Sequence, residues 1–262
     1  MDTPPLIDGL AVPSFVVPGS VAENVCFLRN RVNEIGLCFF ETEACLAYTA
    51  DDLPPLADCG ELRFHIHLPL DLPWPNEGAP LKGIENTVRQ AIAVADVAAY
   101  LHPRFAILHP PQGSVSWQRR VLSSFADIWL RHSNVALLLE NTPECPVVNL
   151  GGTFLNSREL GFCLDTGHLL AYNQTEILVS DVLEMCFLVH WSAPGSLKPH
   201  KHLPLTALDS QQMAMLANIV PRLPQVCTHM LEIFSWEGIK ASMPVLQQLV
   251  PHVSTWPQSL NR

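Results

Sequence analysis

Residues 160–168 read LGFCLDTGH, an apolar run that turns polar at Asp165 and continues into Thr166, Gly167 and His168. The run is nearly continuous in apolar residues, and a strand has this composition when both of its faces are buried, as in a parallel sheet. The carboxylate stands where such a strand would end. A buried strand with a polar carboxyl end is therefore the pattern to look for in the rest of the chain.

The same pattern recurs along the whole sequence. The eight predicted strands are residues 14–17, 34–40, 62–68, 105–109, 135–140, 160–165, 187–190 and 229–233. Amphipathic stretches between them predict helices at 21–30, 81–101, 117–131, 174–184, 205–219 and 236–249, and less regular helical patterns cover 42–56 and 147–158. Eight strands that alternate with about eight helices predict an α/β fold, a (β/α)8 TIM barrel. A doubly wound open sheet is the alternative.

Composition narrows the class of protein. The chain has 262 residues, of which 48% are hydrophobic and 15% charged, and no change in composition divides it, so we expect one TIM-barrel domain over residues 1–262. The net charge of −10, with scattered basic residues, argues against a nucleic-acid partner. No apolar run approaches the roughly 20 residues that cross a bilayer, so we expect no membrane partner.

The cysteines and the first residues bear on the cellular compartment. The eight cysteines form no CxxC pair, and several lie inside apolar runs, as is typical of reduced thiols in the core of a cytoplasmic protein. Met1 to Leu10 carries acids and prolines instead of a basic stretch followed by an apolar one, so no secretory signal is visible. We therefore expect a cytoplasmic protein.

Six consecutive predicted strands end in a residue that can bind a metal. These strand-end residues are His67, His109, Glu140, Asp165 (followed by His168), His190 and Glu232. A buried carboxylate or imidazole costs several kcal/mol unless it is paired or bound to metal, and a barrel brings all of these ends to one mouth. Singly, each could be a hydrogen-bonded structural residue, and Asp165 could cap the following helix. Together they predict a site for divalent metal ions, with zinc preferred over manganese or iron for mixed His, Asp and Glu ligands.

The proline-rich loop after the seventh strand adds His200 and His202. Two histidines at i and i+2 of an extended loop can project to the same side as a chelating pair, although a solvated basic turn would read the same way.

Five further residues could contact the substrate. Glu41 ends the second strand and could bind a substrate hydroxyl or cap the next helix. Asp71 and Trp74 follow the third strand, where an aromatic ring could pack on a flat ligand or simply fill a surface loop. Arg63 and Lys201 could bind phosphate or serve only solubility.

These strand ends resemble a known superfamily between about Leu62 and Ser235. The matching elements are His109-Pro110, Leu139-Glu140-Asn141-Thr142, Leu164-Asp165-Thr166-Gly167-His168, His190, His202 and Leu231-Glu232. They resemble the xylose-isomerase-like barrels, which include sugar isomerases and epimerases and DNA repair enzymes of the endonuclease IV type.

The resemblance to the endonuclease IV type implies three metal sites. His67, His109 and Glu140 would hold the first ion; Glu140, Asp165, His190 and Glu232 would hold the second, with Glu140 as the bridge; His168, His200 and His202 would hold the third. The endonuclease pattern has Asp-Arg-His where this chain has His200-Lys201-His202, so the third site lacks ligand charge. The resemblance therefore implies one to three divalent ions per chain.

A narrower resemblance runs through nearly the whole chain. The runs HLPLDL at 67–72 and LEIFS at 231–235 resemble the cobamide-remodelling hydrolases of the CbiR type. That family hydrolyses the phosphoribosyl linkage in the nucleotide loop of corrinoid cofactors and leaves cobinamide phosphate and an α-riboside. The resemblance implies a metal-dependent phosphodiester hydrolase with a small-molecule substrate and with Glu140, Asp165, His190 and Glu232 in the catalytic role.

Three other functions remain open on the same residues. A sugar isomerase or epimerase would need one ion, held by Glu140, Asp165, His190 and Glu232. An endonuclease would share the ligands, but an acidic chain should repel a DNA duplex. A corrinoid-binding module without turnover would be a non-enzymatic alternative.

Overall fold

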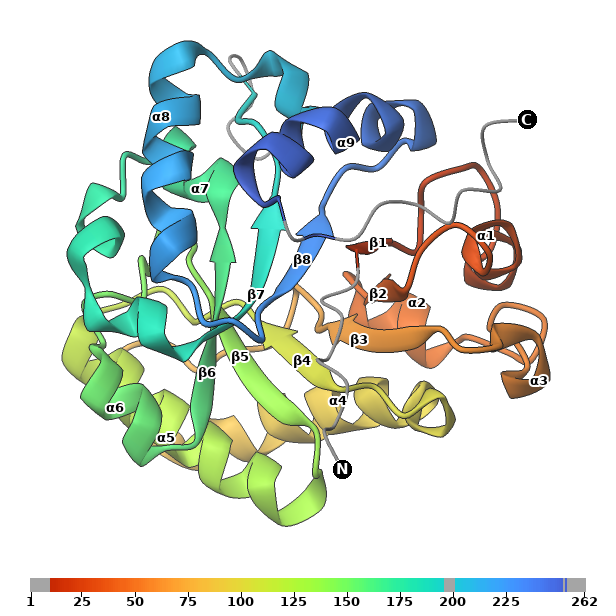
Figure 1. Cartoon of the computed structure of the whole chain (residues 1–262). Helices are drawn as coiled ribbons and strands as arrows, with labels where there is room; N and C mark the ends of the chain where they lie inside the picture. Colours follow the sequence, from red (N-terminus) through yellow and green to blue (C-terminus); the bar gives the residue numbers. More distant parts are fainter. Residues whose placement is uncertain (1–9, 196–200, 252, 254–262) are drawn as a thin grey trace, which may run out of the picture.

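The computed structural model describes residues 10–195, 201–251 and 253, and these form a closed barrel of eight parallel strands in sequential order (Figure 1). The strands are β1 (Leu10–Pro13), β2 (Glu34–Cys38), β3 (Arg63–His67), β4 (Phe105–Leu108), β5 (Ala136–Glu140), β6 (Leu160–Asp165), β7 (Cys186–Trp191) and β8 (Thr228–Leu231). The barrel closes where Leu10 and Ala11 of β1 pair with His229 and Met230 of β8. This closure confirms the (β/α)8 barrel and excludes the open sheet.

Helices surround the barrel on its outside (Figure 1). They are α1 (Val21–Leu28), α2 (Thr42–Leu46), α3 (Leu56–Cys59), α4 (Ile84–Val97), α5 (Val115–His132), α6 (Gly152–Ser157), α7 (Thr166–Ala171), α8 (Ser210–Ile219) and α9 (Trp236–Leu249). In α4 the apolar stripe at Ile84, Val88, Ala91 and Ala95 is buried, as its helical spacing requires. None of the helices described here is long and apolar enough to cross a membrane.

The barrel interior has its own small apolar core. It consists of Ala11, Cys38, Phe105, Ile107, Leu138, Cys163, Leu188 and Met230, separate from the larger core between strands and helices. Because side chains alternate along a strand, Glu140 and His190 lie two residues beyond Leu138 and Leu188 on the same inward face. The apolar layer therefore forms a floor beneath the polar side chains of the barrel mouth.

Two predicted elements differ from the structure in position or type, and others, such as the helices predicted at 42–56 and 205–219, differ in their bounds. The first strand is Leu10–Pro13, not residues 14–17, because the backbone N–H groups of Val16 and Val17 donate to Asn24 Oδ1, at 2.9 and 3.0 Å, instead of to a strand. Residues 174–184 form two short 3-10 helices, Thr175–Val179 and Asp181–Met185, not one α-helix. By contrast, 160–165 and 236–249 match β6 and α9 to the residue.

Candidate metal centre at the barrel mouth

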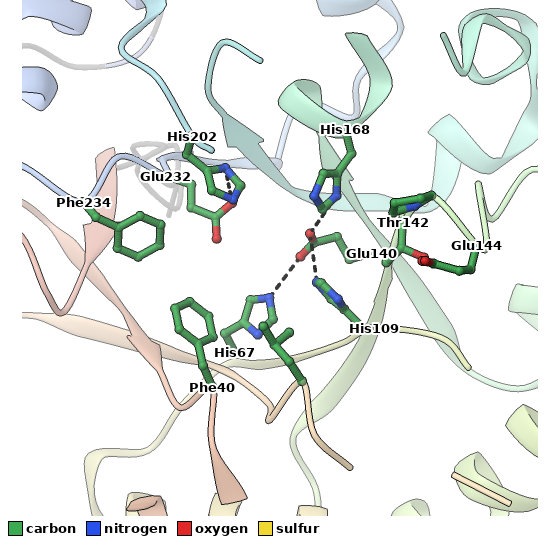
Figure 2. Close-up of a pocket in the computed structure, with 12 residues that line it drawn as sticks. Phe40, His67, His109, Glu140, Thr142, Glu144, His168, His202, Glu232 and Phe234 are labelled. Carbon is green, nitrogen blue, oxygen red and sulfur yellow. Dashed lines mark hydrogen bonds and ion pairs between the residues drawn. The ribbon is translucent and has the colours of Figure 1, made fainter. Parts of the chain in front are cut away.

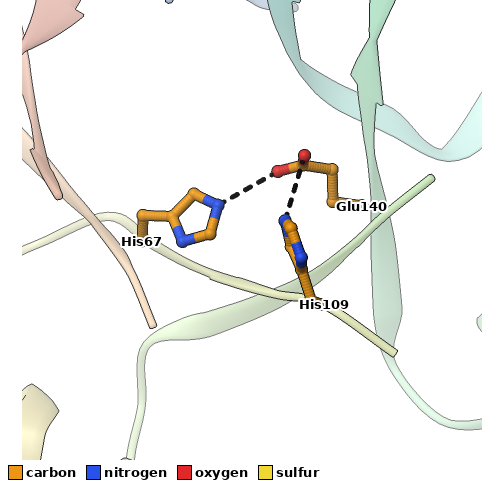
Figure 3. A group of neighbouring side chains, drawn as sticks. All are labelled: His67, His109 and Glu140. Carbon is orange, nitrogen blue, oxygen red and sulfur yellow. Dashed lines mark hydrogen bonds and ion pairs between the residues drawn. The ribbon is translucent and has the colours of Figure 1, made fainter. Parts of the chain in front are cut away.

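Glu140, the last residue of β5, is the centre of the mouth. Its carboxylate is buried, and three imidazoles from other strands approach it: His67 Nε2 at 3.2 Å from Oε2, His109 Nε2 at 3.2 Å from Oε1, and His190 Nδ1 at 3.3 Å from Oε2. Figure 3 shows His67 and His109 pointing at the two carboxylate oxygens. One donor atom each from His67, His109 and Glu140 forms a group in which all atoms lie within 4.8 Å of one another.

A second group lies on the neighbouring strands and shares Glu140. It joins Glu140 to Asp165 at the end of β6, His190 in β7 and Glu232 just after β8, again with all donor atoms within 4.8 Å. His190 Nδ1 is 3.1 Å from Glu232 Oε2. Ligands about 2.0–2.2 Å from one zinc ion are separated by less than about 4.4 Å, so a small closure would bring all four onto a common cation.

A third group contains Asp165, His168 and His202 within the same 4.8 Å limit. His200, the expected third ligand here, lies outside the described residues. Asp165 also caps α7, because its Oδ1 accepts a hydrogen bond from the His168 backbone N–H at 2.5 Å. The Asp165 side chain thus has two roles: Oδ1 caps α7, and Oδ2 faces the mouth.

Several buried polar atoms in the mouth make no hydrogen bond to any other residue that the structure describes. They are Glu140 Oε2, Asp165 Oδ2, Glu232 Oε2 and both ring nitrogens of His190. Some of these atoms are within ion-pair distance of each other, but not in the direction that a hydrogen bond needs. Buried polar groups without partners are rare because each costs free energy. The donor set, two or more carboxylates with imidazoles, is one that a divalent cation satisfies.

Backbone carbonyls fix the orientation of two of the imidazoles. His67 Nδ1 lies 2.9 Å from Leu68 O, and His168 Nδ1 lies 2.8 Å from Asn141 O. Since a carbonyl only accepts, each Nδ1 donates its N–H to the carbonyl, and each Nε2 is the ring nitrogen that would bind a metal.

Asn141 and Gln174 are positioning residues that the sequence did not identify. Asn141 Oδ1 accepts from the Asp165 N–H at 2.7 Å, and its Nδ2 donates to Gln174 Oε1 at 2.9 Å. Gln174 Nε2 in turn donates to Thr142 O at 2.7 Å. The place of Asn141 directly after Glu140 is a signal that could have been used, whereas nothing near Gln174 in the sequence marks it.

The buried carboxylates and imidazoles of the mouth shift one another's pKa values. Burial alone would raise the pKa of Glu140, but the imidazoles of His109 and His190 bring that pKa well below its usual range. Burial likewise opposes protonation of His190, yet Cys163, Glu232 and Glu140 beside it raise its pKa well above the usual value. For Asp165, burial dominates and raises the pKa despite His168 and His202. In the metal-free protein, protonated imidazole therefore supplies part of the positive charge that the carboxylates require.

The mouth opens into a cavity of about 400 Å³. Its lining, drawn in Figure 2, is Phe40, His67, Leu70, His109, Glu140, Thr142, Pro143, Glu144, His168, His202, Glu232 and Phe234. Phe40, Leu70, Thr142, Glu144 and Phe234 were not among the residues predicted from the sequence. The cavity thus has the metal-binding groups at its base and a mixed apolar and polar rim.

Four of the five predicted substrate contacts lie on the mouth side of the barrel but do not line this cavity. Glu41 and Lys201 are exposed beside it, and Glu41 stands at the start of α2 without making a side-chain cap. Asp71 Oδ1 accepts from the N–H and the hydroxyl of Thr42, at 2.9 and 2.7 Å. Trp74 packs on Phe125 of α5, with ring centroids 5.4 Å apart. Asp71 and Trp74 therefore have structural partners instead.

Arg63 lies at the opposite end of the barrel. It is the first residue of β3, and its Nε is 3.4 Å from Glu34 Oε2. The prediction that Arg63 binds phosphate is therefore wrong, because the amino end of a barrel strand points away from the mouth.

Comparisons with known proteins support the fold. No protein-family model and no curated protein matches the sequence. Among solved structures, the chain is similar to endonuclease IV from Thermus thermophilus, with a TM-score of 0.66 and 18% identity over 92% of this chain and 99% of that one. It is also similar to D-psicose 3-epimerase from Clostridium cellulolyticum, with a TM-score of 0.62 and 8% identity over 94% and 100%.

A third similar structure is a xylose isomerase-like TIM barrel protein from Mycobacterium smegmatis in complex with magnesium. Its TM-score is 0.56 at 12% identity, over 94% of this chain and 98% of that one. These similarities show that the chain has the fold of the xylose-isomerase-like barrels, and at such identities they show the fold alone.

Proposed function

We propose that this protein is a metal-dependent phosphodiester hydrolase that acts on the phosphoribosyl linkage in the nucleotide loop of cobamides. The observation that carries the proposal is that candidate metal-ligand groups share Glu140 and Asp165, and that buried polar atoms of Glu140, Asp165, His190 and Glu232 have no hydrogen-bond partner among the described residues. Shared carboxylates are typical of sites in which two or more ions act on one phosphate.

Each group has a defined role in the proposal. His67 and His109 would hold one ion with Glu140, and Asp165, His190 and Glu232 would hold the other, so that Glu140 bridges them. His168 and His202 would hold a third ion with Asp165. When bound, such ions supply a nucleophile from water near neutral pH and neutralise charge on the phosphoryl oxygens. Zinc suits these mixed nitrogen and oxygen donors, and manganese or iron are the alternatives.

The rim of the cavity favours a small substrate over a nucleic acid. None of the described lining residues is Lys or Arg, whereas surfaces that bind a row of phosphates carry clusters of these residues. A single phosphodiester could be neutralised by the ions alone. The cobamide substrate itself is supported by the HLPLDL and LEIFS runs, at 67–72 and 231–235.

The test is to incubate the metal-loaded protein with coenzyme forms of cobamides and to look for cobinamide phosphate and an α-riboside by mass spectrometry. We expect both products in equal amounts, and neither with the Glu140→Gln variant. Absence of both products with fully loaded wild-type protein would contradict the proposal.

A sugar epimerase is the second candidate function. The group of Glu140, Asp165, His190 and Glu232 could hold one ion by itself, and epimerases are among the proteins with a similar fold. Metal analysis separates the two candidates, because one bound ion per chain favours the epimerase and two or three favour the hydrolase.

A further inference from the structure

One side of the cavity is apolar and exposed. Phe40 follows β2 and Phe234 follows β8; their ring centroids lie 5.9 Å apart at an interplanar angle of 70°. Phe234 is 38% exposed, the one exposed phenylalanine among the described residues, and Leu70 beside the same cavity is 51% exposed. We call Phe40, Leu70 and Phe234 the aromatic wall. Apolar surface held open at a cavity indicates a ligand that covers it.

The aromatic wall adjoins the candidate metal ligands. The ring of Phe40 packs edge-on against His67 at 5.0 Å, and the ring of Phe234 packs edge-on against His202 at 5.7 Å. Figure 2 shows both rings on the side of the cavity opposite Thr142 and Glu144. A group attached directly to the reacting phosphate would therefore reach the wall, and its polar edge would face Thr142 and Glu144.

We propose, on the basis of the function proposed above, that the nucleoside half of the substrate enters the cavity and stacks its flat heteroaromatic base on the aromatic wall, while the corrin ring stays outside. A cavity of about 400 Å³ is in the range that holds a small ligand, and a nucleoside is small enough for it whereas a corrin macrocycle is far larger.

The electrostatics of the cavity agree with this orientation. No Lys or Arg is among the described lining residues, so an uncharged group beyond the phosphate fits this part of the cavity. Its binding free energy must then come from apolar contact and ring stacking, which the wall offers, and from ribose hydroxyls donating to acceptors such as Glu144.

The experiment is calorimetric titration of the metal-loaded protein with two probes, a benzimidazole riboside and cobinamide phosphate. We expect Phe234→Ala to weaken riboside binding by at least about tenfold, as loss of one stacking ring does, and Phe40→Ala to act in the same direction. Phe234→Tyr keeps a ring and should restore most of the affinity. Binding of cobinamide phosphate should change less than threefold in each variant.

The matched control is Val179→Ala, which removes an apolar side chain that is 84% exposed elsewhere on the surface. It should leave riboside affinity unchanged. Metal content and thermal unfolding of each variant show that the barrel and its ions are intact, and Phe234, being exposed, carries the test if Phe40→Ala does not fold.

Three results would overturn the inference: no riboside binding to the wild type, equal riboside binding to folded Phe234→Ala, or a selective loss of cobinamide phosphate binding in that variant. If cobamides are nevertheless hydrolysed, the proposed function stands without the aromatic wall. If no cobamide is hydrolysed but Phe234→Ala weakens riboside binding, the wall stands and the proposed function fails.

Discussion

Each end of the barrel buries a glutamate beside at least one histidine, but only at the amino end do the described residues donate a hydrogen bond to both carboxylate oxygens. At the amino end, Glu34 is fully buried and is contacted by His65 Nδ1 at 2.8 Å, Arg104 Nη1 at 2.9 Å and Arg63 Nε at 3.4 Å. At the mouth, Glu140 has imidazoles around it and no Lys or Arg within ion-pair distance in the described part of the chain.

The difference lies in which atoms are left without partners. Both carboxylate oxygens of Glu34 accept hydrogen bonds, one from His65 and one from Arg104. Burial would raise the pKa of Glu34, but His65 and the two arginines lower it below the usual value, so the carboxylate stays ionised. At the mouth, by contrast, five buried polar atoms have no hydrogen-bond partner among the described residues: three carboxylate oxygens and the two ring nitrogens of His190. A buried Glu–His cluster is therefore evidence for a metal site only where the chain itself does not complete it.

The largest effect on activity should come from replacing Glu140, which the first and second ligand groups at the mouth share. Glu140→Gln removes an anionic donor from two groups, so we expect kcat for cobamide hydrolysis to fall about 10³-fold or more, the equivalent of several kcal/mol of transition-state stabilisation. The metal-free variant should still fold, although it loses the ion pairs between Glu140 and the imidazoles. Turnover and urea unfolding test the two expectations, and near-normal turnover would contradict a bridging role.

A change in the Glu34 cluster at the amino end should instead lower the stability and leave the activity nearly unchanged. Glu34→Gln removes charge-assisted hydrogen bonds from a buried site, so the free energy of unfolding should fall by about 3 kcal/mol, while kcat stays within a few-fold of wild type. Asp127→Asn is the control, because its exposed ion pair with Arg158 should contribute about 0–1 kcal/mol. Equal destabilisation by the two variants would show that the Glu34 cluster does not hold the barrel end together.

Removing the metal ions should lower the stability through the mouth alone and leave the Glu34 cluster unaffected. If the ions are present at about 100 times their Kd, chelation removes about 2.7 kcal/mol of stability and lowers Tm by roughly 5–10 °C. Differential scanning calorimetry should give the same shift in Glu34→Gln and a clearly smaller one in Glu140→Gln. An undiminished shift in Glu140→Gln would place the stabilising ion elsewhere.

The smallest effect concerns pH. Because the pKa of folded Glu34 lies below its unfolded value of about 4.5, its stabilising contribution is fully present above that pH and is lost as the pH falls through the folded pKa. The difference in unfolding free energy between wild type and Glu34→Gln, both metal-free, should therefore become smaller between pH 6 and pH 3. Urea unfolding at several pH values measures it, and a constant difference would mean that Glu34 is not held ionised.

The sequence predicted those parts of the fold in which burial of apolar side chains alone decides the local structure. Residues 160–165 are apolar because both faces of β6 are buried, and the prediction matched the strand. It failed for residues 14–17, whose β-branched side chains favour a strand but whose N–H groups bind the buried Asn24, a tertiary contact that local pattern does not reveal.

The candidate site likewise contains residues that the sequence predicted and residues that it did not. Strand-end positions were enough to bring Glu140, Asp165, His190 and Glu232 together, since a parallel barrel gathers its carboxyl ends. The aromatic wall and Gln174 escaped prediction because their place depends on how loops fold back over the mouth. Arg63 was misassigned because its basic side chain was interpreted without reference to the end of the strand that it occupies.

The double use of Asp165 has a consequence for engineering. Its Oδ1 starts α7 and its Oδ2 faces the mouth, so most replacements would unravel a helix while they emptied the site. Asparagine is the exception, because it caps helices as well as aspartate but offers no negative charge. An Asp165→Asn barrel would thus keep the cap of α7 while the mouth loses one of its carboxylates, and such a variant is a starting point for building a different chemistry.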